Sequence, residues 1–560
     1  MKPNFLPFTK WITSVFIRSK VPFLLAATLL AACHPDVIVE EEARLRSISV
    51  TETALVLPEG GQALFHFQIQ EPGYVPDLRV GDSRGQVSLT LFDDTAPQYV
   101  KLSEVLPDDR PGGYVAVLTG RGDNNFQEDV YLRIRSKEGE TVTAPRVSVR
   151  GEKYVEVEPL FVETGLPVVV IDTQGGRRID SKETYVPGTV RIQSNGGYDG
   201  LPETSCEIRG RGNTTWYWPK KPYLIKLEEK QSLFGMPKHK RWILLANFMD
   251  RTLMRNLVSM KVASMMSNLA WTPGCVPVEL VLNGRHMGSY LLIEQVRVDK
   301  KRVAVTEMTP QDNVGDAVTG GYLLELDFHY DNEVQWIDPH GHNNQWGNGI
   351  PFGVKYPDPE DLTPQQRTYI QGYISEAANT LYGNDFKDPE KGYAKYIDVD
   401  SFIDYWITFE VMGNHELGNP GSVYMHKDRN GKLVAGPCWD FDWGVLSYNT
   451  SPHARTGLVN GNAIWYARLR QDPAFNAKLK ARFDELLPKL ETIPAYIDEC
   501  EKLLTESARL NFAMWNPADD RSQSGDGKII NGDEEMTFHD AVARLKSIYQ
   551  ERLQVIPKNL

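Results

Sequence analysis

The stretch Val423–Trp443 carries the strongest fold signal in the chain and reads VYMHKDRNGKLVAGPCWDFDW. Two apolar runs flank an Asp-Arg-Asn-Gly turn, which predicts a β-hairpin. The hairpin is followed by Asp440 and Asp442, and an extended backbone would project both side chains the same way. Two carboxylates held so close repel one another unless a cation lies between them. Magnesium fits this role because it takes one or two carboxylates and leaves positions for water and phosphate.

Length and composition bound the class of protein. With 560 residues, of which 41% are hydrophobic and 24% charged, the chain is typical of a globular protein with two or three domains. The formal net charge of −13 argues against nucleic acid as a partner, because a surface that binds phosphate backbones needs an excess of basic side chains.

The amino terminus has the pattern of an export signal. Basic residues precede the apolar run Val21–Ala32, which is too short to span a bilayer. Leu30-Ala-Ala-Cys33 resembles a bacterial lipobox, so residues 1–32 are predicted to be a lipoprotein signal peptide and Cys33 the lipidated first residue. A simple secretory signal with a chance cysteine is the alternative. Acyl chains on Cys33 would anchor the protein to a membrane of the bacterial cell envelope, periplasmic or surface-exposed.

The other four cysteines are scattered, without a C-x-x-C pair, which argues against zinc. Disulfides and buried free thiols both remain open for them. They are Cys206, Cys275, Cys438 and Cys500.

Turn-forming residues and changes in composition along the chain predict two folded units after an acidic tether at 33–46. Short alternating strands at 47–150 predict a small all-β sandwich of the immunoglobulin-like kind, serving as a spacer or as a binder of glycan or protein. Residues 165–560 begin with strands and turn helical after about Thr363, which predicts an α+β fold of two lobes. The helices expected there are Gln365–Leu381, Phe402–Met412, Ala463–Leu469, Ala477–Leu490, Ala495–Ala513 and His539–Val555.

A glycine-bearing turn lies at Ile208–Trp216, which reads IRGRGNTTW. Glycines between basic residues let backbone N–H groups approach an anion such as phosphate, although a lone Gly-x-Gly is often only a tight turn. Lysines follow on the next strand, and an inward lysine would neutralise phosphate, whereas an outward one would be a solvated strand face. The candidate cofactor-binding residues here are Gly210, Arg211, Gly212, Asn213, Lys221 and Lys226.

Between this turn and the first hairpin lie two further signals. Asp250 or Thr252 is expected to cap a helix over Leu257–Leu269. An Asn283-Gly284 turn then predicts a second hairpin, whose exit carries Glu294, a further candidate for the cofactor site.

The ordered set of motifs resembles the spore coat protein H (CotH) kinase family, which are atypical protein kinases. The resemblance covers residues 166 to at least 448, and several motifs in the right order are more specific than any one of them. The motifs are Gly210–Trp216, Pro219–Tyr223, Asn283-Gly284 through Glu294-Gln295, Gly320–Asp327 and Gly436–Asp442.

This resemblance implies a kinase-like, two-lobed domain over 165–560 that binds ATP with magnesium or manganese between its lobes. It implies that the glycine turn covers the phosphates and that Lys226 or a neighbour contacts them. It also implies that Asp440 is the magnesium-binding Asp of a kinase Asp-Phe-Gly motif. Asp442 stands where that motif has glycine, so it would be a second metal ligand.

One departure from the family pattern concerns the catalytic base. The catalytic-loop Asp of a kinase would fall within 411–422, and this segment contains no Asp. Glu416 is the nearest carboxylate, with His415 as a second candidate base, and Asn419 or Ser422 would hold the second metal. The extra methylene of Glu416 moves its oxygens by roughly an ångström, which degrades in-line geometry.

Three functions follow from these residues. The first is an exported, lipid-anchored protein kinase that transfers the γ-phosphate of ATP to hydroxyls of an envelope or extracellular protein. The second is a catalytically weak or inactive kinase-like lipoprotein that serves as a binding or structural platform. A minor third is carbohydrate chemistry, because tryptophans and paired acids also suit sugars.

Overall fold

The structure is a computed structural model that describes residues 47–70, 78–80, 86–92, 94–121, 124–135, 141–153, 163–194, 196–328, 334–344, 346–449, 452–517 and 531–560. The predicted signal peptide, Cys33 and the tether at 33–46 lie outside the described residues. In the part that is described, no helix is both long and apolar enough to cross a membrane.

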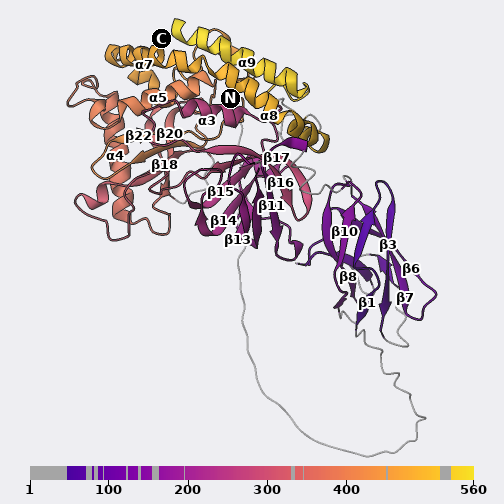
Figure 1. Cartoon of the computed structure of the whole chain (residues 1–560). Helices are drawn as coiled ribbons and strands as arrows, with labels where there is room; N and C mark the ends of the chain where they lie inside the picture. The colour runs from indigo at the N-terminus through magenta and orange to yellow at the C-terminus, as the bar shows by residue number, and fades with distance from the viewer. Residues whose placement is uncertain are drawn as a thin grey trace, which may run out of the picture. The chain divides into compact units, whose positions relative to one another are not determined.

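The first folded part, from Ile48 to Gly151, consists of two sheets around a common apolar core (Figure 1). One sheet has the order β1-β3-β7-β6 and the other the order β2-β10-β8-β5-β4, with β9 paired to β8. Alternate side chains point inward, as along β3, which buries Ala63, Phe65 and Phe67. This arrangement supports the predicted β-sandwich. The strands are β1 Ile48–Val50, β2 Ala54–Leu57, β3 Gln62–Ile69, β4 Arg79–Val80, β5 Gln86–Thr90, β6 Val100–Pro107, β7 Gly113–Gly120, β8 Gln127–Arg135, β9 Thr141–Thr143 and β10 Val147–Gly151.

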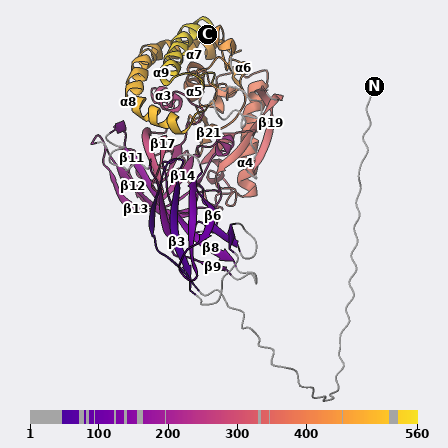
Figure 2. The same cartoon turned by 90° about the vertical axis from the view of Figure 1, so that its right-hand side faces the viewer.

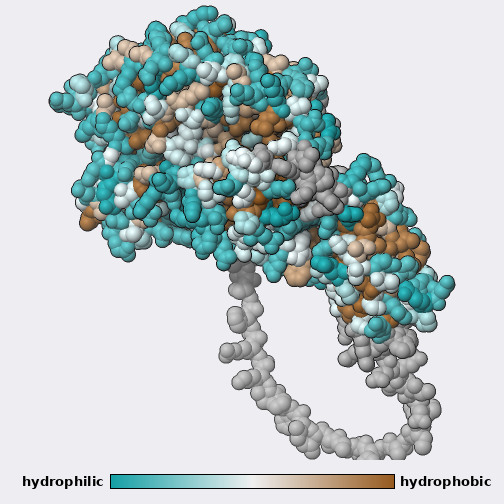
Figure 3. Space-filling view, in the orientation of Figure 1, coloured by the Kyte–Doolittle hydropathy of each residue, from teal (hydrophilic) through white to brown (hydrophobic). Residues whose placement is uncertain are grey.

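The sandwich also exposes apolar side chains. Val56, Leu64 and Leu106 are about half exposed, and Figure 3 shows hydrophobic residues gathered on the visible face of this part. Exposed apolar groups of this kind are common where a protein meets a partner, so the alternative of protein binding keeps a physical basis beside the spacer role.

The next part is a closed barrel with the strand order β11-β12-β13-β14-β15-β17-β16. Parallel pairing of β11 with β16 closes it, and the other neighbours are antiparallel. Alternation again separates two faces, so Ile225 and Leu227 fill the interior while Leu224 faces outward onto the rest of the chain. The strands are β11 Val168–Thr173, β12 Val186–Gln193, β13 Leu201–Gly210, β14 Tyr223–Gln231, β15 His239–Leu245, β16 Cys275–Leu282 and β17 Arg285–Glu294.

A five-stranded sheet of order β19-β20-β18-β21-β22 and most of the helices form the remainder (Figures 1 and 2). Figure 1 shows α7, α8 and α9 together on one side of this part. The strands are β18 Tyr322–Leu326, β19 Gln335–Asn343, β20 Gly347–Tyr356, β21 Val423–Lys427 and β22 Leu433–Ala435. The helices are α2 Thr214–Tyr217, α3 Arg255–Ala263, α4 Pro364–Tyr382, α5 Val399–Val411, α6 Tyr466–Leu469, α7 Pro473–Leu490, α8 Ile493–Met514 and α9 Phe538–Val555.

Strands therefore come first and helices later, and the mixed α+β class is confirmed. The two predicted hairpins form β16–β17 and β21–β22. The helix expected at Leu257–Leu269 corresponds to α3, which is shorter and ends at Ala263. At the start of α3, Asp250 accepts a hydrogen bond from the Arg255 N–H.

The extended backbone expected through Asp440 and Asp442 is wrong at Asp440, whose φ of 64° lies in the left-handed region. Residues 440–447 form neither helix nor strand. The reason is tertiary: side chains from other segments hold this loop, as described below.

The four cysteines outside the predicted signal region are free thiols. Burial raises the pKa of Cys206 and Cys275 to about 12, so these side chains behave as inert apolar groups.

Candidate active site

A cavity of about 850 Å³ lies between the outer face of the barrel and the five-stranded sheet. Leu224, Ile243 and Leu245 form its barrel wall, and Leu323 of β18 lies among the lining residues from the sheet. The size lies in the range of small-molecule sites, and an apolar wall with a few polar groups is the usual composition of such sites.

Two carboxylates meet in this cavity, because Asp440 and Asp442 both line it and are hydrogen-bonded to each other. Burial raises the pKa of Asp440, against the positive charge of Arg211 and hydrogen bonds from Asp442 and Ser422. Burial and the negative charge of Asp440 raise the pKa of Asp442 well above its usual value. Both carboxyl groups of the pair therefore favour the protonated form more than a free Asp does, and a bound cation would oppose this.

Backbone strain accompanies these groups. Asp440 and Ser422 have φ values of 64° and 55°, and Asn247, which also lines the cavity, has 47°. Non-glycine residues seldom adopt the left-handed region, and strained residues of this kind gather at functional sites.

The candidate bases lie in the same cavity. Burial and the charges of Asp440, Asp442 and Asp327 raise the pKa of Glu416 well above its usual value. One Glu416 oxygen, Oε2, is buried without a hydrogen-bond partner in the described structure. Burial lowers the pKa of His415, which favours the neutral imidazole. Asn419 lines the cavity as well.

The glycine turn contributes Arg211, Gly212 and Asn213 to the lining. Arg209 and Arg211 lie two residues apart, and both reach the cavity. Arg209 stacks over Tyr185 and Arg211 over Trp439, and neither forms an ion pair within the described ranges. An arginine in a cavity that forms no ion pair is a candidate anion-binding residue, because the donors of its planar guanidinium group match the oxygens of a phosphate.

Four predicted cofactor residues lie outside this lining. Lys226 pairs with Glu207 at 2.7 Å, and Lys221 donates to the Trp216 carbonyl at 2.6 Å. Glu294 accepts from the Gly274 N–H at 2.9 Å and lies 3.4 Å from Arg302. Gly210 packs against the Trp216 ring, where a Cβ would clash, so its role is close packing under the turn.

Asp327 and Glu325 are site residues to which sequence reasoning gave no role. Both line the cavity, and Asp327 accepts a hydrogen bond from the Ser422 N–H at 3.2 Å. Glu325 accepts from Tyr424 at 2.6 Å and pairs with Lys355 at 2.8 Å. The available signal was the spacing of the two acids, because Glu325 lies in β18 and Asp327 follows one residue after the strand ends at Leu326.

The donor set of the cavity fits a hard divalent cation. Asp440 and Asp442 would hold the cation. Their pKa values are raised, which indicates two buried carboxyl groups that lack a fully compensating positive charge. No cluster of three or more His, Cys, Asp or Glu suited to a metal occurs among the described residues. Magnesium needs fewer, because it retains water and takes phosphate oxygens.

A strand-rich barrel, a second sheet and a cavity of acids and arginines define a mixed α+β protein with a polar ligand site. The family model of the CotH kinase protein matches residues 208–556, more than half of the chain, so the chain belongs to this family, as its motifs indicated. No curated protein matches it. Among solved structures, the Salmonella enterica SafA pilin in complex with the SafB chaperone matches at 9% identity over 36% of this chain and 97% of that chain. Its TM-score of 0.15 is too low to support any argument.

Proposed function

We propose that the chain is an exported, lipid-anchored protein kinase with a kinase-like, two-lobed domain, which binds ATP between the barrel and the five-stranded sheet. One observation carries the proposal: Asp440, Asp442 and Glu416 share a single cavity with Arg209 and Arg211. Phosphoryl transfer depends on positioning and on charge neutralisation. The acids would bind a cation, and the guanidinium groups, which form no ion pair in the part of the chain that the structure describes, would bind phosphate.

In this proposal the apolar barrel wall receives the base of the nucleotide, and the glycine turn with Arg211 receives the phosphates. Arg211 takes the place first assigned to Lys226, because the Arg211 guanidinium acts on Asp440 electrostatically while the Lys226 ammonium is bound to Glu207. A divalent cation on Asp440 and Asp442 supplies neutralisation of phosphate charge.

Glu416 is the proposed acceptor of the substrate proton. An acceptor hydroxyl oxygen attacks the γ-phosphorus, the bond to the bridging oxygen breaks with its electron pair leaving on ADP, and the hydroxyl proton passes to Glu416. Burial and the charges of Asp440 and Asp442 hold the pKa of Glu416 high. Neutralising those two charges would remove the smaller part of the rise, whereas burial, its largest cause, would remain.

The test is phosphate transfer from labelled ATP by the purified protein, with magnesium or manganese, to itself or to envelope proteins. We expect incorporation that Asp440→Asn abolishes and that the matched control Lys226→Gln leaves unchanged. No incorporation under any of these conditions would contradict the kinase proposal. Radiolabelled palmitate on the wild-type chain, absent from Cys33→Ala, tests the lipid anchor.

A second candidate is an inactive platform that binds the nucleotide without transferring phosphate. The raised pKa of Glu416 favours it, because a protonated carboxyl group accepts no proton. Calorimetry with ATP and magnesium measures nucleotide binding, which both the active kinase and the inactive platform require. Binding of ATP with magnesium, lost in Asp440→Asn but without transfer, identifies the platform.

A further inference from the structure

The loop that carries the two acids, residues 440–447, is held by side chains from three distant segments. Asn414, after α5, donates to the Asp440 carbonyl at 3.3 Å. Asn256 of α3 accepts from the Phe441 N–H at 2.8 Å. The third segment is the short stretch 531–534 that precedes α9. Because the loop has no helix or strand of its own, these contacts determine its conformation.

Asn531 makes the largest contribution to this framework. Its amide nitrogen donates to the carbonyls of Asp442, at 3.2 Å, and Met249, at 3.0 Å. Its amide oxygen accepts from the Gly444 N–H at 2.9 Å, and its carbonyl accepts from the Ser447 hydroxyl at 2.7 Å. Asn531 is fully buried, so no water can replace these hydrogen bonds.

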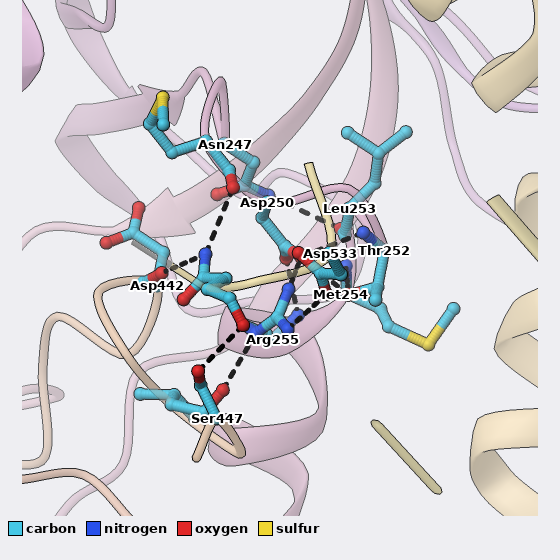
Figure 4. A network of polar contacts seen from close by, with 12 residues as sticks. Asn247, Asp250, Thr252, Leu253, Met254, Arg255, Asp442, Ser447 and Asp533 are labelled. Atoms are coloured by element: carbon cyan, nitrogen blue, oxygen red, sulfur yellow. Dashed lines mark hydrogen bonds and ion pairs between the residues drawn. The ribbon is translucent and has the colours of Figure 1, made fainter. Parts of the chain in front are cut away.

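The segment around Asn531 is itself anchored. Figure 4 shows Arg255 between Asp250 and Asp533, and both ion pairs are buried. The Arg255 Nε also donates to the Val445 carbonyl at 2.8 Å. One guanidinium therefore ties the start of α3, the acid-bearing loop and the segment at 531–534 into one unit.

We infer that Asn531 is a positioning residue that fixes the conformation of Asp442, and through it the cation affinity of the cavity. Asn531 does not line the cavity, so it acts through the loop backbone. It bonds on both sides of Trp443, at the Asp442 carbonyl and at the Gly444 N–H, and so holds the backbone from which the Asp442 side chain projects. The inference rests on the proposed function for its cation and extends it to a residue remote in sequence.

The experiment compares Asn531→Ala with Asn511→Ala in the full chain. Asn511 is a matched control, because it is also a buried amide and accepts from Lys220 at 2.8 Å and from the Ser289 N–H at 3.2 Å, outside the loop. Two measurements are made: hydrogen exchange of a peptide over 438–447, and binding of manganese alone by electron paramagnetic resonance. If Asn531→Ala does not fold, Asn531→Ser replaces it, because serine keeps a polar group there.

Asn531→Ala removes the three side-chain hydrogen bonds to Asp442, Gly444 and Met249. We expect it to speed exchange over 438–447 and to weaken manganese binding about tenfold, which corresponds to the free energy of about one buried hydrogen bond. Asn511→Ala should change neither. Unchanged exchange and affinity in a folded Asn531 variant, or equal changes in both variants, would overturn the inference. If the wild-type chain binds no manganese, the proposed metal-dependent function fails instead, and the exchange measurement still decides whether Asn531 holds the loop.

Discussion

Replacing Arg255 by methionine tests the framework of the site most directly. Asp250 and Asp533 lie on either side of its guanidinium and are 0% and 1% exposed. Methionine fills a similar volume but removes the ion-pair partner of two buried carboxylates and leaves the Val445 carbonyl without its donor at 2.8 Å. We therefore expect a large loss of stability, because an uncompensated buried charge costs more than the ion pair gains.

The size of the loss follows from burial. Breaking a buried ion pair by removing one partner costs about 3–5 kcal/mol. With an unfolding entropy of about 2.1 cal/mol/K per residue, a cooperative unit of about 400 residues would lose about 4–6 °C in melting temperature.

Thermal unfolding followed by circular dichroism measures this shift. The matched variant is the triple substitution Arg255→Met, Asp250→Asn and Asp533→Asn, which removes both charges together with their partner. We expect it to recover more than half of the lost melting temperature, because charge burial and not packing is the cause. A shift below about 1 °C in Arg255→Met, or no recovery in the triple variant, would refute the reasoning.

Four further predictions concern the cavity. Manganese affinity should rise with pH, by at most about tenfold per unit, because protons compete with the metal for Asp440 and Asp442, whose pKa values are raised. Manganese titrations from pH 5 to 8 measure this rise, and an affinity that does not change with pH contradicts it. Without metal the same raised pKa values mean that the folded state binds more protons than the unfolded state, so stability should fall as the pH rises through them. Arg211→Gln should weaken ATP binding about tenfold or more in calorimetry, whereas Lys226→Gln should not; equal effects would return Lys226 to the site. Glu416→Gln should leave the melting temperature of the metal-free protein within about 1 °C and lower phosphate transfer about 100-fold or more, and full transfer by this variant would exclude Glu416 as the base.

Local patterns predicted the secondary structure well. The periodicity over Gln365–Leu381 corresponds to α4 at Pro364–Tyr382, and the two turn sequences correspond to the hairpins β16–β17 and β21–β22. These features depend on residues within one or two turns of each other, so a short window of sequence contains their cause.

Lys226 shows where such reasoning stops. Alternation correctly separates it from the barrel interior and puts it on the same face as Leu224, which lines the cavity. Two residues along a strand are about 7 Å apart, however, and at that distance Lys226 meets Glu207 instead of the cavity. Which end of a strand face borders a cavity depends on strand pairing and on the sheet across the cavity, and the local pattern contains neither.

The sequence by itself determined the family of this protein and the order of its strands and helices, and it singled out Asp440 and Asp442 as candidate metal ligands. Only the tertiary structure decided that Arg209 and Arg211 line the same cavity as those acids, that Asp440 adopts a left-handed conformation, and that Asn531 bonds to the loop that carries them. The physical reason is range. Turns and periodicity arise between near neighbours, whereas the loop geometry of the cavity arises between residues up to 282 positions apart, which packing alone brings together.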